Sequence, residues 1–309
     1  MYGFEQHIAS NKTKTFFLIL GFFAFMAILG WIVGYLIDPE VSYVVLAGCV
    51  VVALIGTGVS YWKSDSIIAT LVNARPANPG VYIEKYYMDT IEGLVLACGL
   101  PAVPRAYVIE TDALNAFATG RDPNHSLVCV TTGLLGKLDR QELEGVIAHE
   151  MSHVYNRDIL LMGVAAVLVG GIAMFSHVIL RIVFWGGGGG GRSSRDGDKG
   201  GCGGIGIIVA LVFLILAPIF ANLLNLMMSR KREFLADATA VKLTRNPDGL
   251  ISALSKISQS DETMPFVESE LAGLFIDHPQ KKDENASWFA TLFATHPPIP
   301  ERIEALKSM

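Results

Sequence analysis

The sequence contains few charged residues. Asp, Glu, Lys and Arg make up 17% of its 309 residues, whereas a soluble domain normally carries about 25%. Hydrophobic residues reach 51%, and the mean hydropathy is +0.44. Because the charge deficit is confined to parts of the chain, the composition indicates membrane-spanning segments attached to an otherwise ordinary domain.

Cysteine and net positive charge are also scarce. The four cysteines are scattered and form no C-x-x-C pair, which argues against a disulfide framework and against a thiolate zinc site. They are Cys49, Cys98, Cys129 and Cys202. The formal net charge is −5, so a nucleic-acid partner has no electrostatic support.

Long apolar runs, in contrast, are abundant. A helix needs about 20 apolar residues to cross a bilayer. Four runs reach that length: Thr15–Ile37, Val41–Trp62, Ile159–Trp185 and Ile205–Met228. The first has no small-residue cleavage site with a soluble domain behind it, so we expect a retained span and not a signal peptide. The Gly-rich segment 186–204 is interpreted as a flexible linker of open function. Whether the third and fourth runs cross the bilayer fully or bend back within it stays open.

Four crossings divide the chain into five parts. These are an N-terminus (1–14), a transmembrane hairpin (15–62), a first hydrophilic segment (63–158), a second hairpin (159–228) and a second hydrophilic segment (229–309). Lys and Arg gather on the side of the hydrophilic segments, including the cluster at 230–232. Positive flanks favour the cytoplasm, which predicts a multi-pass protein of the inner or plasma membrane with both hydrophilic segments cytoplasmic. Arg230 and Arg232 are expected to contact lipid headgroups.

The hydrophilic segments carry both helical and β-prone patterns, which predicts an α+β unit, mainly α, completed by helices from both segments. Asp139 followed by Glu142 is a capping-box pattern at the start of one helix. Helices are expected at 78–101, 140–156, 232–258 with a break at Asn246-Pro247, and 296–308, and β-prone runs at 105–110, 115–120 and 126–135.

The helix at 140–156 carries the pattern His149-Glu150-Met151-Ser152-His153. Residues four apart stand one above the other on a helix, so two imidazole nitrogens can bind one zinc ion. Glu150 lies one step round the helix, where it can hold a water without being a ligand. A surface helix with two solvated histidines is the alternative interpretation.

A hydrolytic zinc needs a third protein ligand and an open position for water. The candidates are Glu233, His177, His278 and His296. Glu233 is favoured because it lies just after the fourth apolar run, as the second histidine lies just before the third. Asp237 follows at i+4, where it can accept a hydrogen bond from the other nitrogen of a ligand histidine.

With these residues assembled, the sequence closely resembles the HtpX family of membrane zinc metalloproteases, relatives of the CAAX prenyl protease. The resemblance covers most of the chain and rests on motifs in a fixed order. They are NAFATG (115–120), VTTGLL (130–135), LEGVIAHEMSHVYNRD (143–158), REFLADATAV (232–241) and THPPIPERI (295–303). The resemblance implies a four-helix transmembrane region with a cytoplasmic gluzincin-type domain. It also implies one Zn²⁺ on His149, His153 and Glu233, Glu150 as general base, and a role in quality control of membrane proteins under stress.

The resemblance further implies that Asn115, Ala116, Phe117 and Ala118 form an edge strand beside the cleft. An exposed edge can pair with an extended substrate backbone, although an interior strand with a turn at Gly120 fits the sequence too. His296 is a candidate donor to the oxyanion, or it simply starts the last helix. His177 and Arg181 either mark a polar path in the membrane or reach the interface.

The sequence therefore predicts a membrane-embedded zinc endopeptidase with its active site in the cytoplasm. Its expected partners are polypeptide substrates, mainly membrane proteins, together with the lipid bilayer and membrane regulators or other quality-control proteases. Two alternatives stay open: a CAAX-type processing protease and a non-catalytic, zinc-stabilised membrane scaffold.

Overall fold

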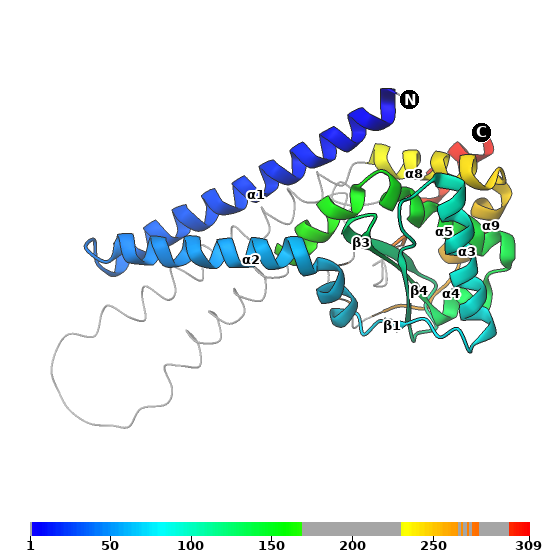
Figure 1. Ribbon diagram of the computed structural model, residues 1–309, viewed down its shortest axis with the longest axis horizontal. Coiled ribbons are helices and arrows are strands. Elements are labelled where there is room, and N and C mark those ends of the chain that lie inside the picture. The colour runs from blue at the N-terminus through cyan, green and yellow to red at the C-terminus, as the bar shows by residue number, and fades with distance from the viewer. Residues whose placement is uncertain (1, 169–229, 265–266, 268–270, 272–273, 278–296) are drawn as a thin grey trace.

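A computed structural model describes residues 2–168, 230–264, 267, 271, 274–277 and 297–309. Two long helices, α1 (Tyr2–Ile37) and α2 (Ser42–Leu71), pack against each other. They project together as an arm from a globular part that contains the remaining described elements (Figure 1). The N-terminal end of α1 returns to the globular part, near α8 in Figure 1.

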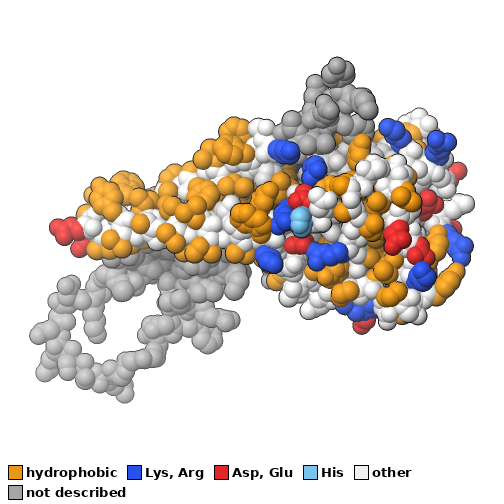
Figure 2. Space-filling view, viewed as in Figure 1, with side chains coloured by type: hydrophobic (Ala, Val, Ile, Leu, Met, Phe, Trp, Pro, Cys, Tyr) orange, Lys and Arg blue, Asp and Glu red, His pale blue; other side chains and the backbone are white. Residues whose placement is uncertain are grey.

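The arm is apolar on its outside. Figure 2 shows hydrophobic side chains along its length, with acidic side chains at its far end. Segments Ser10–Ile32 and Ser42–Leu71 are long and apolar enough to cross a membrane. Large apolar side chains exposed on the arm include Phe16, Phe17, Leu20, Ile28, Trp31, Tyr43, Val44, Val51, Leu54 and Ile55. Exposed apolar surface of this extent needs a partner such as lipid, which agrees with a membrane protein.

The predicted second hairpin is described only where it begins. Asp158–Leu168 is a short apolar helix, and it packs against α1 through Leu161, Val164 and Leu168. The rest of the third run, the Gly-rich segment and the whole fourth run lie outside the described residues. The crossing of the bilayer by these runs therefore stays a prediction.

Helix α2 is longer than the predicted second span. It continues past Trp62 to Leu71, and its last turns enter the globular part. There Ile68, Ala69 and Val72 join a buried cluster with Phe117. The arm and the globular part therefore share one continuous helix.

A four-stranded sheet forms the centre of the globular part. Its strands are β1 (Arg75–Pro76), β2 (Arg105–Ile109), β3 (Ala116–Asp122) and β4 (His125–Thr131), in the order β1-β2-β4-β3. β2 and β4 are parallel, whereas β3 and β4 form an antiparallel hairpin. Strand β3 is therefore at one edge of the sheet, as the expected edge strand requires.

The β-prone run 126–135 is wrong beyond Thr131. Its last residues belong instead to helix α4 (Thr132–Lys137), which Thr131 caps by accepting a hydrogen bond from the Leu134 amide. A threonine at this position satisfies a free amide of the first helical turn, so it ends the strand although the residues around it favour β structure.

The other helices follow the sequence pattern closely. They are α3 (Tyr82–Cys98), α5 (Arg140–Tyr155), α8 (Arg230–Thr244), α9 (Pro247–Ser258) and α11 (Ile299–Lys307). Asp139 and Glu142 form the predicted capping box at the start of α5. The predicted break at Asn246-Pro247 separates α8 from α9, where Asn246 caps the second helix.

Helix α5 lies in the middle of the core. Every residue from Glu142 to Val154 except Glu144 is buried, and α9 crosses it very closely. A Cβ atom added at Gly145 would lie 2.9 Å from the Leu250 amide nitrogen, so only glycine permits this crossing. The packing fixes the position of the helix that carries both histidines.

Candidate metal centre

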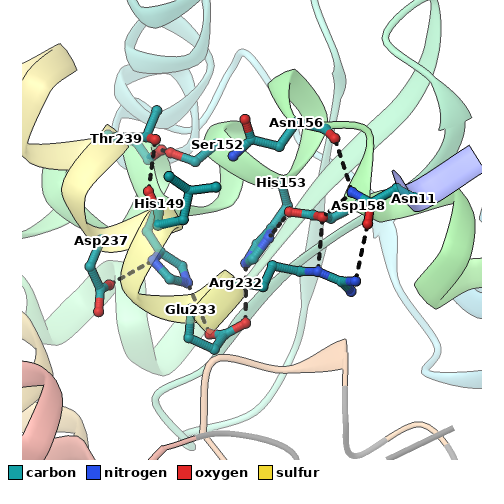
Figure 3. Close-up of polar contacts among 12 residues, drawn as sticks. Asn11, His149, Ser152, His153, Asn156, Asp158, Arg232, Glu233, Asp237 and Thr239 are labelled. Carbon is teal, nitrogen blue, oxygen red and sulfur yellow. Dashed lines mark hydrogen bonds and ion pairs between the residues drawn. The ribbon is translucent and has the colours of Figure 1, made fainter. Parts of the chain in front are cut away.

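The two histidines of α5 and the first turn of α8 meet at one point. His149, His153 and Glu233 each present one ligand atom, and the three atoms lie within 4.8 Å of one another. Glu233 Oε2 is 3.6 Å from His149 Nε2, and Glu233 Oε1 is 3.7 Å from His153 Nε2. All three side chains are buried, and Figure 3 shows them converging.

The outer nitrogen of each imidazole is held by an aspartate. His149 Nδ1 is 2.9 Å from Asp237 Oδ1 on α8, the contact expected from the i+4 spacing. His153 Nδ1 is 3.1 Å from Asp158 Oδ2. An aspartate that accepts the Nδ1 proton leaves Nε2 free to bind a metal. Both imidazoles are therefore fixed in the tautomer that a metal site requires.

Asp158 was missed by the sequence analysis. It follows the end of α5, and Arg157 between them has a φ of 60°. This left-handed conformation, uncommon outside glycine, reverses the chain so that Asp158 returns toward His153. The position of a residue after such a reversal does not follow from helical spacing.

The spacing of these atoms fits a metal ion better than direct hydrogen bonds. Nε2–O distances of 3.6 and 3.7 Å are too long for hydrogen bonds. Tetrahedral ligands at the usual zinc distances lie about 3.4 Å apart. The three residues therefore surround a space of the size that a zinc ion takes.

The buried charges also favour a divalent cation. Four buried carboxylates, Glu150, Asp158, Glu233 and Asp237, share this region with the guanidinium groups of Arg232 and Arg302. With neutral histidines, two negative charges are left over in this buried cluster. Buried charge without a counter-ion is costly, and a Zn²⁺ ion would balance it.

His149 compensates for part of this charge when no metal is bound. Burial and the positive charge of Arg302 oppose its protonation, but the carboxylates of Asp237 and Glu233 outweigh both and raise the pKa of the imidazole to about 9. A metal ion that binds Nε2 must therefore displace a proton.

Glu150 lies beside the histidines and is almost completely buried. Burial raises the pKa of its carboxyl above the ordinary value, although the histidines and Arg302 pull it in the opposite direction. A carboxylate with a raised pKa accepts a proton more readily at neutral pH. Its position next to His149 on α5 suits a group that takes a proton from a water in this space.

Arg302 was not recognised as a site residue from the sequence, although it lies in the motif THPPIPERI. It is completely buried, and its Nε and Nη2 atoms donate to the two Asp237 oxygens at 2.9 and 2.7 Å. Its Nη1 atom lies 4.0 Å from Glu233 Oε2. Arg302 Nη2 also lies 3.3 Å from His149 Nδ1. We treat that approach as packing, because Nδ1 donates its proton to Asp237.

The expectation that Arg232 contacts lipid headgroups is wrong. The side chain is buried, and its Nε atom lies 2.9 Å from Asp158 Oδ1. Its Nη2 atom donates to Asn11 Oδ1 at 3.2 Å. The sequence could not show which face of α8 points inward, so a basic cluster near an apolar run was assigned to the membrane surface.

The predicted edge strand is partly occupied by the chain itself. The Ile276 amide donates to the Ala116 carbonyl at 3.0 Å, and the Asn115 side chain bonds both backbone groups of Asp277. The ring of Phe117 packs against that of Phe275 at a tilt of 58°. The next residue whose backbone amide and carbonyl point away from β4 is Ala118, because these groups alternate along an antiparallel strand. Ala118 is buried, as are all residues from Ala113 to Gly120, so the edge is covered at this point.

Four of the candidate residues lie outside the described residues. They are His296, the candidate oxyanion donor, His278, a candidate third ligand, and His177 and Arg181. Their roles stay predictions.

The chain is similar to several known proteins. Residues 84–309 match the family described as Peptidase family M48. The chain is 43% identical over 312 residues to a Protease HtpX homolog of Listeria monocytogenes, with 99% of both chains covered. A Protease HtpX homolog of Streptococcus gordonii is 41% identical over 307 residues, with 99% of both chains covered. The crystal structure of S. mikatae Ste24p aligns with a TM-score of 0.48 and 17% identity, covering 97% of this chain and 66% of that one.

Proposed function

Since the chain belongs to peptidase family M48, and within it to the HtpX metalloproteases, we propose that it is a zinc endopeptidase that cleaves misfolded or damaged membrane proteins at the cytoplasmic face of the cell membrane. One observation carries the proposal. His149, His153 and Glu233 converge in a buried space, and carboxylates fix both imidazoles with Nε2 toward it.

In this mechanism His149, His153 and Glu233 hold the ion, and a bound zinc supplies Lewis-acid chemistry toward the attacking water and the scissile carbonyl. Glu150 orients that water, removes one of its protons and delivers the proton to the leaving amine nitrogen. Asp237 and Asp158 keep the imidazoles in place throughout. Arg302 holds Asp237 and balances its buried charge.

The substrate backbone is proposed to pair with the outer edge of β3, which is buried in this structure and must be uncovered first. Ala118 supplies the outward amide and carbonyl, because Asn115 and Ala116 are already bonded to residues 276–277. Pairing through backbone groups reads little of the substrate's side-chain sequence. This property suits an enzyme that removes varied damaged chains, and an arm long and apolar enough to cross a membrane supports a location among membrane proteins.

The test compares wild type with Glu150→Gln in detergent and in lipid. Zinc content and cleavage of casein and of an unfolded membrane protein are measured on the same samples. The mutant is expected to keep about one zinc per chain and to lose cleavage. Glu144→Gln is the matched control, because Glu144 is exposed on the same helix, and it should cleave normally.

Two results would contradict the proposal. Cleavage restricted to a prenylated C-terminal peptide would favour a CAAX-type processing enzyme. Zinc binding without cleavage in the wild type, also after zinc readdition and in lipid, would favour the scaffold.

A further inference from the structure

Helix α1 contributes a side chain to the surroundings of the metal centre. Asn11 is buried, and its amide nitrogen donates to Asp158 Oδ1 at 2.7 Å and to the Asn156 carbonyl at 3.3 Å. Its amide oxygen accepts a hydrogen bond from Arg232 Nη2 at 3.2 Å. Figure 3 shows Asn11 beside Asp158, with Arg232 contacting both.

These contacts join three separate elements. Asn156 ends α5, Arg232 lies in the first turn of α8, and Asn11 joins the hydrogen bonds from α1. Lys14, also on α1, acts on Arg232 and Asp158 through its charge. Residues 84–309 match the family, so Asn11 lies 73 residues before that region begins. A side chain of the apolar arm therefore completes a network that the peptidase region does not complete alone.

The two oxygens of Asp158 have different partners. Oδ2 accepts from His153 Nδ1 at 3.1 Å, whereas Oδ1 accepts from Asn11 and from Arg232 Nε. Rotation of the carboxylate would break these contacts together. Because Asn11 both donates to Asp158 and accepts from Arg232, it fixes the two groups relative to each other.

We propose that Asn11 is a positioning residue of the metal site: it holds the Asp158 carboxylate so that His153 presents Nε2 to the ion. The inference rests on the proposed metal centre and extends it into the arm. Loss of a group that orients a metal-binding histidine typically lowers metal affinity or activity by about 10–100-fold. Asn11 acts one step further out, so we expect a loss near the lower end.

The experiment uses the full chain in detergent with Asn11→Leu, which is similar in volume and makes no hydrogen bond. Zinc affinity is measured by competition with a chromogenic chelator, and the visible spectrum is recorded after Co²⁺ substitution. We expect about a tenfold loss of zinc affinity and an altered Co²⁺ spectrum. At saturating zinc, kcat should fall while KM stays constant, because Asn11 does not contact substrate.

Thr15→Val is the matched control. Thr15 is buried one turn further along α1, and among the described residues its hydroxyl bonds only the Asn11 carbonyl of its own helix. This variant should bind zinc as the wild type does. An equal loss in both variants would show that packing of α1, and not the Asn11 amide, supports the site.

A double-mutant cycle with Asp158→Ala tests the route of the effect. If Asn11 acts through Asp158, Asn11→Leu should cause no further loss of affinity once Asp158 is gone. Full additivity of the two losses would overturn the proposal, as would unchanged affinity and spectrum in Asn11→Leu. A wild-type chain that binds no zinc would overturn the metal site itself, which separates the two failures.

Discussion

Each histidine is held by a support of one aspartate and one arginine, and the two supports come from different parts of the chain. In the first support, built from α5, α8 and α11 of the peptidase region, His149 donates to Asp237, which is paired with Arg302. In the second support His153 donates to Asp158, which is paired with Arg232. The second ends on α1, through Asn11.

This difference separates an enclosed support from an assembled one. Arg302 and Asp237 are both completely buried, and Asp237 has no other charged partner than Arg302 and His149 among the described residues. Asp158 has both Arg232 and the Asn11 amide. The site therefore has one histidine support that belongs to the globular part and one that depends on docking of the arm formed by α1 and α2.

The largest effect on stability is expected from removing the guanidinium of the first support, Arg302. Arg302→Met leaves Asp237 buried without its ion-pair partner, which should lower the free energy of unfolding by about 3–5 kcal/mol. Arg232→Met should cost less, because Asn11 still donates to Asp158. Chemical unfolding of both variants in detergent measures the difference. Equal losses of unfolding free energy would mean that the two supports depend equally on their ion pairs.

Removing the carboxylate charge of either support should act mainly on zinc affinity. Asp237→Asn and Asp158→Asn are each expected to weaken zinc binding by about 10–100-fold, because an amide holds the Nδ1 proton less strongly. Among the described residues the two supports share Glu233 and no other side chain, so we expect the two losses to add in the double variant. Zinc competition on the three variants tests this. Strong non-additivity would indicate one network instead of two.

The smallest effect is expected from changing a buried carboxylate that belongs to neither histidine support. Glu142 lies on α5 and accepts from Lys256, Ser252 and the Asp139 amide. Burial alone would raise the pKa of Glu142, but these hydrogen bonds outweigh it and lower the pKa. Glu142→Gln should therefore reduce the free energy of unfolding by about 1 kcal/mol at pH 7 and leave zinc affinity unchanged.

The pH dependence of this loss has a definite sign. A folded-state pKa below the unfolded value of about 4.5 makes the ionised form stabilising. The stabilisation is fully present above that value and disappears as the pH falls through the folded pKa. The difference in melting temperature between wild type and Glu142→Gln should shrink from neutral pH toward pH 3. A constant difference would show that the cap geometry matters and the charge does not.

The sequence predicted the parts of the site that lie on regular helices. His149 and His153 follow from i+4 spacing, and Glu233 and Asp237 from their place on the helix after the fourth apolar run. The capping box at Asp139 and the break at Asn246 follow from local chemistry. Regular spacing and caps are local signals, whereas the choice of Glu233 depended on its place relative to the apolar runs.

The residues that support the site were not predictable in the same way. Asp158 depends on a chain reversal at Arg157, and Arg302 comes from the far end of the chain. Asn11 comes from the other end. The available signal was a polar or charged side chain within or beside an apolar pattern, which does not say what it faces. The same lack of a facing direction led to the wrong expectation for Arg232.

Helix α2 sets a fixed distance between the apolar arm and the sheet of the globular part. Its 30 residues extend about 45 Å, whereas the hydrocarbon layer is about 30 Å thick. The last turn ends in the core beside β3, through Ile68 and Val72. If α2 crosses the bilayer, β3 cannot move toward or away from it without breaking that core. A substrate of the proposed kind, anchored in lipid, would then have to extend about 15 Å beyond the hydrocarbon layer, the difference between the two lengths, to reach β3.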